Sequence, residues 1–188
     1  MAVLPIRIMG DPVLHAPAAA VGEITDEVRR LVGDMFETMD AAPGVGLAAP
    51  QVGVPLRIYT YSYQDDDGAP WRGVIVNPEL WMTPLEPGSP DPDQESEGCL
   101  SFPGERFALR RSDRVLVTGI DLEGKPIEVR ADGWRARIMQ HEFDHLDGIL
   151  YVDRLDDADW KTAQKIARKR GWGRAGASWT PGVDDIDA

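Results

Sequence analysis

The chain is poor in the side chains that form disulfides and bind soft metals. Its 188 residues include one cysteine, Cys99, and three histidines, His15, His141 and His145. A single cysteine excludes an intrachain disulfide, and a free thiol is typical of a reducing compartment. Because so few of these side chains are present, their positions carry most of the information about a metal site.

The chain also lacks a long apolar run and an excess of positive charge. No segment approaches the ~18 consecutive apolar residues of a membrane span, and the first residues lack the basic and apolar regions of a signal peptide. Lysine and arginine number 20 against 32 acidic residues, a formal net charge of −12. Such a mean charge repels the phosphates of nucleic acids. We therefore predict a cytoplasmic protein that binds neither DNA nor a membrane.

Length and composition are those of one globular domain. Hydrophobic residues make up 43% and charged residues 28% of the chain, close to average usage. A chain of this size buries ~70% of the surface that its unfolded form exposes, which is enough for one core. We expect a single domain over residues 1–171, including a C-terminal helix, and a partly flexible tail over residues 172–188, which is rich in glycine, proline and aspartate.

Apolar periodicity and capping residues predict three helices. The first covers residues 25–41, where apolar residues recur on one helix face and the initial threonine is the N-cap. The second covers residues 132–147, with the initial aspartate as N-cap and Gly148 as the left-handed terminator. The third covers residues 156–170, with acids at its start and bases at its end, as the helix dipole favours.

Short runs rich in β-branched and aromatic residues predict strands between these helices. They lie at residues 57–61, 73–76, 115–120 and 126–129. A turn is expected at Asp67-Gly68. Residues 86–97, with three prolines, five acids and no base, are predicted to form an exposed loop. Strands bracketed by helices without a βαβ order predict an α+β fold with mixed or antiparallel sheets.

The most specific motif lies in the second predicted helix. Residues 140–145 read Q-H-E-F-D-H and contain H-E-x-x-H. His141 and His145 share one helix face, so both can bind one divalent ion. Glu142 can reach a water on that ion and act as its general base. A chance pair of surface histidines is the alternative, and it is made unattractive by the presence of two of only three histidines on one helix.

A catalytic site of this kind needs a third protein ligand and an open position for water. No histidine follows His145, so the candidates are a downstream acid such as Asp153, or Cys99 in the upstream sequence E-G-C-L-S. A lone cysteine is more often a small buried hydrophobe, but beside two histidines it is the best candidate for a thiolate ligand. One thiolate and two neutral imidazoles leave a charge of about +1 on the metal unit, enough to acidify bound water.

A third motif, G-V-G-L-A-A-P-Q, occupies residues 44–51. It matches the dinucleotide pattern G-x-G-x-x-A, but it follows a helix rather than a strand, and Pro50 blocks the helix that a phosphate site needs. A plain glycine turn is the remaining alternative, and it leaves Gln51 unexplained. The amide of Gln51 can donate to a developing oxyanion if this loop reaches the metal.

In this order and at these spacings, the three motifs resemble those of the peptide deformylase family, the hydrolases that remove the N-formyl group from nascent bacterial and organellar proteins. The family patterns G-x-G-L-A-A-x-Q, E-G-C-L-S and Q-H-E-x-D-H stand without departure at residues 44–51, 97–101 and 140–145. The resemblance covers about residues 4–155 and includes G-D-P-V-L at residues 10–14. It implies sheets packed around a central metal-binding helix, with a C-terminal helix.

The resemblance also implies a reaction centre. The implied metal ligands are Cys99, His141 and His145. They would hold one divalent ion per chain, naturally Fe(II), with Zn, Ni or Co as replacements. Glu142 would take a proton from the metal-bound water and pass it to the leaving amine. The side chain of Gln51 and the backbone N–H of Leu100 would hold the formyl oxygen.

Other residues would surround an N-formyl-Met nascent peptide. Those expected to bind its backbone or line its methionine pocket are Val45, Gly46, Arg106, Trp134 and Ile138. Trp134 and Ile138 share the helix face of His141, and Arg137, one turn before that histidine, is expected at the pocket rim. Glu97 and Asp144 are expected to orient the metal ligands or Gln51 by hydrogen bonds.

The basic end of the third helix resembles a surface by which some family members contact the ribosome. Its residues are Lys161, Lys165, Arg168, Lys169, Arg170 and Arg174. Complementation of the helix dipole is an equally good explanation of this charge.

Three other functions are compatible with the motifs. A peptidase can use the same H-E-x-x-H, a Cys–His enzyme can use Cys99 as nucleophile and His141 as base, and a silent relative can bind nascent chains or ribosomes without chemistry. Assays of formylated against free-amine peptides distinguish the first, and chelator inhibition without labelling of Cys99 distinguishes the second. The completeness of all three motifs argues against the third.

Overall fold

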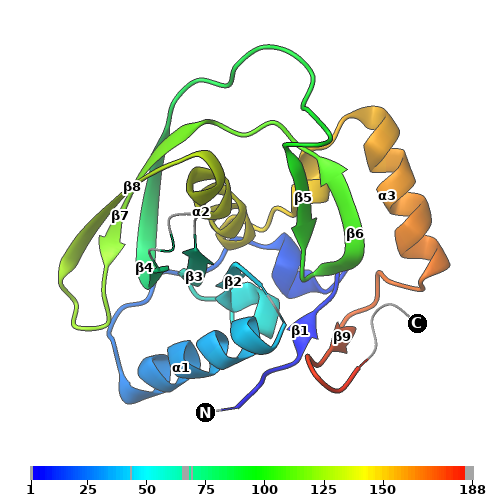
Figure 1. Cartoon of the computed structure of the whole chain (residues 1–188). Helices are drawn as coiled ribbons and strands as arrows, with labels where there is room; N and C mark the ends of the chain where they lie inside the picture. The colour runs from blue at the N-terminus through cyan, green and yellow to red at the C-terminus, as the bar shows by residue number, and fades with distance from the viewer. Residues whose placement is uncertain (1, 43, 65–67, 69, 185–188) are drawn as a thin grey trace.

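The computed structural model describes residues 2–42, 44–64, 68 and 70–184. The elements, in chain order, are β1 (Ile6–Arg7), the 3-10 helix η1 (Pro12–His15), α1 (Asp26–Ala41), β2 (Gly46–Ala48), η2 (Ala49–Val52), β3 (Ile58–Gln64), β4 (Pro70–Met82), β5 (Ser96–Cys99), β6 (Phe102–Ala108), β7 (Arg114–Ile120), β8 (Pro126–Asp132), α2 (Gly133–Leu146), η3 (Tyr151–Arg154), α3 (Asp157–Lys169) and β9 (Ser178–Trp179). Helix α2 lies at the centre, between the larger sheet and the β5–β6 hairpin, and α3 lies on the outside (Figure 1). The fold is α+β with antiparallel sheets, as predicted.

The larger sheet has five antiparallel strands in the order β2-β3-β4-β7-β8. All four predicted strands belong to it, although β4 extends well past its predicted end, to Met82. The register of β4 against β7 shifts between Val76 and Glu79. Asn77 has a positive φ of 50° there, and its side chain bonds the backbone N–H and carbonyl of Val21. A bulge of this kind bends the strand, which the local sequence alone does not indicate.

Helix α2 is buried against the inner face of this sheet. Met139 and Leu146 pack with strand residues such as Tyr59, Ile75 and Val117, all of them fully buried. Because the H-E-x-x-H motif belongs to the same helix, its polar side chains also lie inside the protein rather than on its surface. Their hydrogen-bond and metal requirements must therefore be met internally.

Of the two predicted N-caps, Thr25 makes the capping hydrogen bond and Asp132 does not, and Asp156, which was predicted only as an acid at the start of the third helix, is also a cap. Thr25 caps α1, because its side chain accepts from the N–H of Val28, and Asp156 likewise caps α3. Asp132 stands at the N-cap of α2, but its side chain makes no capping hydrogen bond. Gly148 follows the end of α2 and has a φ of 74°, the left-handed conformation that favours glycine after a helix.

The predicted loop at residues 86–97 is wrong at its end. Residues Ser96–Cys99 form β5, and Glu97 is buried at 4% exposure. The partner strand β6 was not predicted, because its sequence, FPGERFA, lacks a β pattern and its pairing with β5 comes from the tertiary fold. The turn at Asp67-Gly68 lies outside the described residues, since Asp67 is not among them.

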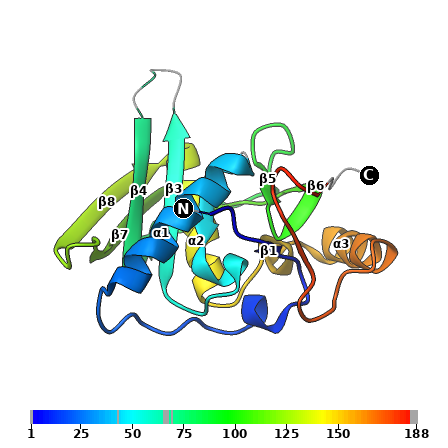
Figure 2. The same cartoon turned by 90° about the horizontal axis from the view of Figure 1, so that it is seen from below.

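The described part of the C-terminal segment, residues 172–184, packs onto the domain. Strand β9 pairs with β1 through Ile6 and Trp179, and the Trp179 ring joins a core with Phe102 and Tyr151. Figure 2 shows this segment returning from α3 to the side of β1. Residues 185–188 lie outside the described part, and flexibility of the tail stays a prediction. No helix among the described residues is long and apolar enough to cross a membrane.

Candidate metal centre

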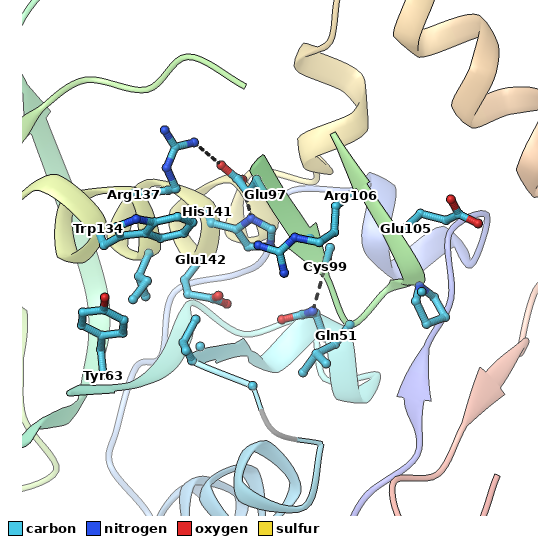
Figure 3. A pocket seen from close by; sticks show the side chains of 18 residues that line it. Gln51, Tyr63, Glu97, Cys99, Glu105, Arg106, Trp134, Arg137, His141 and Glu142 are labelled. Atoms are coloured by element: carbon cyan, nitrogen blue, oxygen red, sulfur yellow. Dashed lines mark hydrogen bonds and ion pairs between the residues drawn. The ribbon is translucent and has the colours of Figure 1, made fainter. Parts of the chain in front are cut away.

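The centre is built from three separate elements. Helix α2 carries His141, Glu142 and His145, the end of β5 carries Cys99, and η2 carries Gln51. Antiparallel pairing and the burial of α2 bring these elements together at a pocket (Figure 3). Residues distant in sequence thus face one another because the sheet and the hairpin flank the same helix.

One cysteine and two histidines converge at this point. The Cys99 Sγ lies 3.3 Å from His145 Nε2, which lies 3.2 Å from His141 Nε2. These three ligand atoms are all within 4.8 Å of one another. Asp153, the other candidate ligand, instead accepts a hydrogen bond from the N–H of Leu150 at the start of η3. The structure therefore brings together the Cys/His/His set.

The two imidazoles face the cluster with one ring nitrogen each. His141 Nδ1 lies 2.6 Å from a carboxylate oxygen of Glu97, to which it donates, so Nε2 faces the cluster. Burial opposes the positive charge of His141, but Cys99 and Glu97 outweigh it and raise the pKa of His141, so an ion bound at Nε2 would take the place of a proton. Burial, together with His141, lowers the pKa of His145, which favours its neutral form. Two imidazole nitrogens and a thiol sulfur facing one another are a donor set that fits a borderline divalent transition-metal ion.

Glu97 is held ionised by two arginines. Arg111 donates to both of its oxygens, at 2.6 and 3.1 Å, and Arg137 donates at 2.9 Å. Burial opposes the charge of Glu97, but Arg111 and the hydrogen bond with His141 outweigh it and lower the pKa of Glu97. Arg137 was predicted at the pocket rim, and it lies deeper than that. Its guanidinium is buried and paired, although the residue does line the pocket.

Asp144 is connected to Glu97 through the guanidinium group of Arg111. Arg111 donates to Asp144 at 2.5 Å, and Arg154 donates to both of its oxygens at 2.5 and 2.6 Å. In the described part of the chain, Asp144 therefore reaches His141 only through Arg111 and Glu97. Arg111 was missed by sequence reasoning, because it lies between β6 and β7 in no recognised motif. Its role depends on a contact with two elements that are remote in sequence.

Glu142 is almost fully buried and faces the pocket. Burial raises its pKa to about 7. A carboxyl group with a pKa near neutral pH can both accept and donate a proton there. Its Oε2 has no hydrogen-bond partner among the described residues. A Cβ atom added to Gly46 would stand 2.2 Å from Glu142 Oε1, so only glycine leaves room for this carboxylate. Strand β2 thus confines Glu142 from one side.

Gln51 is oriented by its neighbours. Its Oε1 accepts from the N–H of Ala48 at 2.9 Å, and its Nε2 lies 3.2 Å from Ser101 Oγ and 3.8 Å from Cys99 Sγ. The amide N–H group therefore points toward the metal cluster, as the sequence hypothesis required. Pro50 is accommodated because the motif forms the short 3-10 helix η2 and no α-helix.

The pocket in front of these residues has a volume of about 570 Å³. The residues predicted to bind substrate, and the candidate oxyanion residue, all line it: Val45, Gly46, Leu100, Arg106, Trp134 and Ile138. Tyr63, Pro103 and Glu105 also line it and were not predicted. Tyr63 is placed there by the register of β3, and the other two by the unpredicted β6, so no local motif identifies them.

Two buried histidines of an H-E-x-x-H motif converge with a cysteine, and a carboxyl group that can exchange a proton near neutral pH lies beside them at a pocket. This arrangement is that of the metal-dependent hydrolases. A comparison with protein-family models matches residues 3–161 to polypeptide deformylase. The chain belongs to the peptide deformylase family.

Individual relatives agree with this assignment. The peptide deformylase of Rhodococcus opacus is 50% identical over 187 residues, which cover 97% of this chain and 95% of that protein. A crystal structure of a peptide deformylase from Legionella pneumophila has a TM-score of 0.78 and 36% identity, covering 90% of this chain and 96% of that one. The Met-Ala-Ser-bound class I type b enzyme of Acinetobacter baumannii has a TM-score of 0.72 and 35% identity, covering 82% and 99%.

Enzymes of this family hydrolyse the N-formyl group of newly made peptides and use a catalytic metal. The family resemblance, fold class and enzyme class predicted from the sequence are thereby confirmed, and so is the predicted activity. Among the alternative functions, a peptidase and a Cys–His nucleophilic enzyme lose their support.

Proposed function

We propose that this chain removes the formyl group from the N-terminal formylmethionine of nascent proteins by hydrolysis at the Cys99, His141 and His145 centre. The observation that carries the proposal is the convergence of these three donor atoms within 4.8 Å, beside Glu142 and at the pocket. The products are formate and a peptide with a free amino group.

The metal is proposed to be one Fe(II) ion per chain, with Zn, Ni or Co as replacements. Cys99, His141 and His145 would hold this ion, which would supply Lewis acidity toward the formyl carbonyl and a pKa of ~7 for its bound water. The soft thiolate and the two imidazoles accept any of these ions. Glu97, by accepting from His141, fixes the tautomer that leaves Nε2 free to bind. Asp144 supports Glu97 indirectly, because both carboxylates share Arg111.

Glu142 is proposed to move the protons. It accepts a proton from the attacking water as the water oxygen bonds to the formyl carbon. It then donates that proton to the amide nitrogen as the carbon–nitrogen bond breaks, so that formate and the amine separate. Burial suits this exchange, because it raises the pKa of Glu142 to about 7.

Gln51 and the backbone N–H of Leu100 are proposed to stabilise the oxyanion. The carbonyl oxygen of the formyl group gains negative charge as the water attacks, and preorganised N–H donors bind it more strongly in that state. Gln51 is suited to this role because Ala48 and Ser101 already fix its amide. The N–H that points toward Cys99 Sγ, at 3.8 Å, is the one proposed to bind the oxyanion.

The pocket is proposed to bind the methionine side chain and the first peptide units. Trp134, Ile138 and Val45 supply an apolar lining for the unbranched thioether. Gly46 and Arg106 also line the pocket, and they are proposed to bind the peptide backbone and the carboxyl side of the peptide, respectively. The similar Acinetobacter baumannii enzyme holds a Met-Ala-Ser tripeptide, which has the sequence expected of a deformylated product.

Activity and metal content measured on the same anaerobic preparation test the proposal. We expect hydrolysis of a formyl-Met-Ala-Ser peptide, formate in equal amount, about one iron per chain, and no cleavage of unformylated Met-Ala-Ser. A Cys99→Ser variant should lose most of its metal, because a hydroxyl is a poor substitute for a thiolate ligand. Cleavage of the unformylated peptide, or full metal retention by Cys99→Ser, would contradict the proposal.

We further propose that the enzyme acts in the cytoplasm and that the end of α3 contacts the ribosome. Lys161, Lys165 and Lys169 are exposed along α3 in a chain whose net charge is −12. A local cationic surface of this kind is attracted to RNA phosphates.

Co-sedimentation with ribosomes tests this contact. A Lys165→Glu variant should bind less, and the effect should weaken as salt rises. A Lys125→Glu variant in the exposed β7–β8 turn is the matched control. Equal sedimentation of all three proteins would leave dipole complementation as the only role of these charges.

A further inference from the structure

The C-terminal segment contacts Leu100, the residue that follows the candidate metal ligand Cys99. This segment comes after residue 161, where the match to the family model ends. The Trp179 indole N–H donates to the backbone carbonyl of Leu100 at 2.8 Å. Trp179 is only 7% exposed and belongs to the core cluster against which Cys99 and Leu100 pack. A buried indole donor normally has one specific partner, and here the partner is an active-site residue.

The amide that accepts this hydrogen bond also donates one. The carbonyl of Leu100 and the N–H of Ser101 belong to the same planar peptide group. The Ser101 N–H donates to Cys99 Sγ at 3.4 Å. One rigid peptide group therefore connects the Trp179 indole at one end with the sulfur of the metal ligand at the other.

The position of Trp179 is itself well determined. Besides the pairing of β9 with β1, the N–H of Ile8 donates to Ala177 O at 2.9 Å, and the N–H of Gly176 donates to Asp11 Oδ2 at 2.9 Å. The N-terminal segment is in turn bonded to the active-site segment, because Met9 N–H donates to Ser101 O at 2.8 Å. Three segments that are far apart in sequence thus form one hydrogen-bonded unit behind Cys99.

We propose that Trp179 is a positioning residue for the reaction centre. It fixes the plane of the Leu100–Ser101 peptide group, and through that plane it maintains the N–H···S hydrogen bond that stabilises negative charge on Cys99. Hydrogen bonds at the two ends of one amide reinforce each other, because each polarises the group in the same sense. It also restricts the backbone at Leu100, whose own N–H faces the formyl oxygen in the proposed function on which this inference rests.

The test compares two Trp→Phe variants of the full chain loaded with Co(II). Trp179→Phe removes the donor and keeps a buried ring. Trp172→Phe is the matched control, since Trp172 packs edge-on against Phe102 in the same core, at 4.9 Å between ring centroids. The readouts are the rate of Co(II) release to a chelator, the energy of the sulfur-to-cobalt charge-transfer band, and kcat and KM for a formyl-Met peptide.

We expect Trp179→Phe to release Co(II) about 3- to 10-fold faster, below the ~10- to 100-fold effect typical of groups bonded directly to a ligand. Its charge-transfer band should move to lower energy, because loss of a hydrogen bond destabilises the sulfur lone pairs. The value of kcat should fall several-fold with little change in KM. Trp172→Phe should match the wild type in all three readouts, even if its melting temperature falls.

Equal metal release and equal band energies in the two variants would overturn the inference and leave Trp179 a purely structural residue. If Trp179→Phe does not fold, 3-benzothienylalanine at position 179 removes the N–H without changing the ring shape and serves for the same comparison. The wild type tests the proposed function separately. Absence of a sulfur-to-cobalt band or of deformylation there would refute the proposed site, and with it this inference.

Discussion

Replacing Glu142 with glutamine should lower kcat/KM for a formyl-Met peptide by about 10³-fold, within the ~10²- to 10⁴-fold range of general acid–base catalysis. The glutamine amide has the same shape but cannot take a proton from water. Glu142 is buried and confined by Gly46, so the substituted side chain should keep its place. Steady-state kinetics on the metal-loaded variant provide the measurement.

Metal content and stability decide how this result is understood. Glu142 is not among the three clustered ligand atoms, so Glu142→Gln should bind the metal as the wild type does and unfold at a similar temperature. A Glu128→Gln variant on the exposed face of β8 should retain full activity. Near-normal turnover by Glu142→Gln would assign the proton transfers to another group.

Arg111→Met should destabilise the protein by about 3 to 5 kcal/mol, the cost of removing one partner from a buried ion pair. The substitution leaves the carboxylates of Glu97 and Asp144 buried without the guanidinium that donates to both. The mutual pairing is strong enough to raise the pKa of Arg111 despite the opposing effect of burial. Urea unfolding of the metal-free protein measures the loss.

Arg154→Met is the control for this prediction. Arg154 also bonds Asp144, but its side chain is 42% exposed and water can replace it. We expect a loss of about 1 kcal/mol, typical of a hydrogen bond at a partly exposed site. Arg111→Met should also weaken metal binding by about 10-fold or more, because Glu97 orients His141. Equal losses of stability in the two variants would show that Arg111 has no special role in the network.

Periodic and capped elements were the most predictable parts of the fold. Helix α1 follows from its apolar stripe and Thr25, and α3 from the acids at its start and the bases at its end. These signals are local, since each depends on residues within a few positions of one another. By contrast β6, β9 and the bulge at Asn77 have no local signal, because their hydrogen-bond partners come from distant segments.

The candidate site also has a part that local sequence signals identify and a part that depends on distant segments. His141 and His145 were identified together because four residues of helix place them on one face, and Glu142 follows from the same motif. Cys99 was the best candidate for the third ligand from its residue type, and Gln51 was a donor only if its loop reached the metal. The family resemblance made both definite, because spacing along the chain cannot show that distant segments meet. Arg111, Tyr63 and Trp179 were missed, since each acts by a contact with an element remote in sequence.

By itself, the sequence of this protein determined the chemical inventory: one thiol, two histidines on one helix face, and a carboxylate beside them. Only the tertiary structure decided which side chains complete and support that inventory. A motif within one helix has its geometry set by the helical repeat. The distances from Cys99 to His145 and from Trp179 to Leu100 depend instead on how the sheet, the hairpin and the C-terminal segment pack around α2.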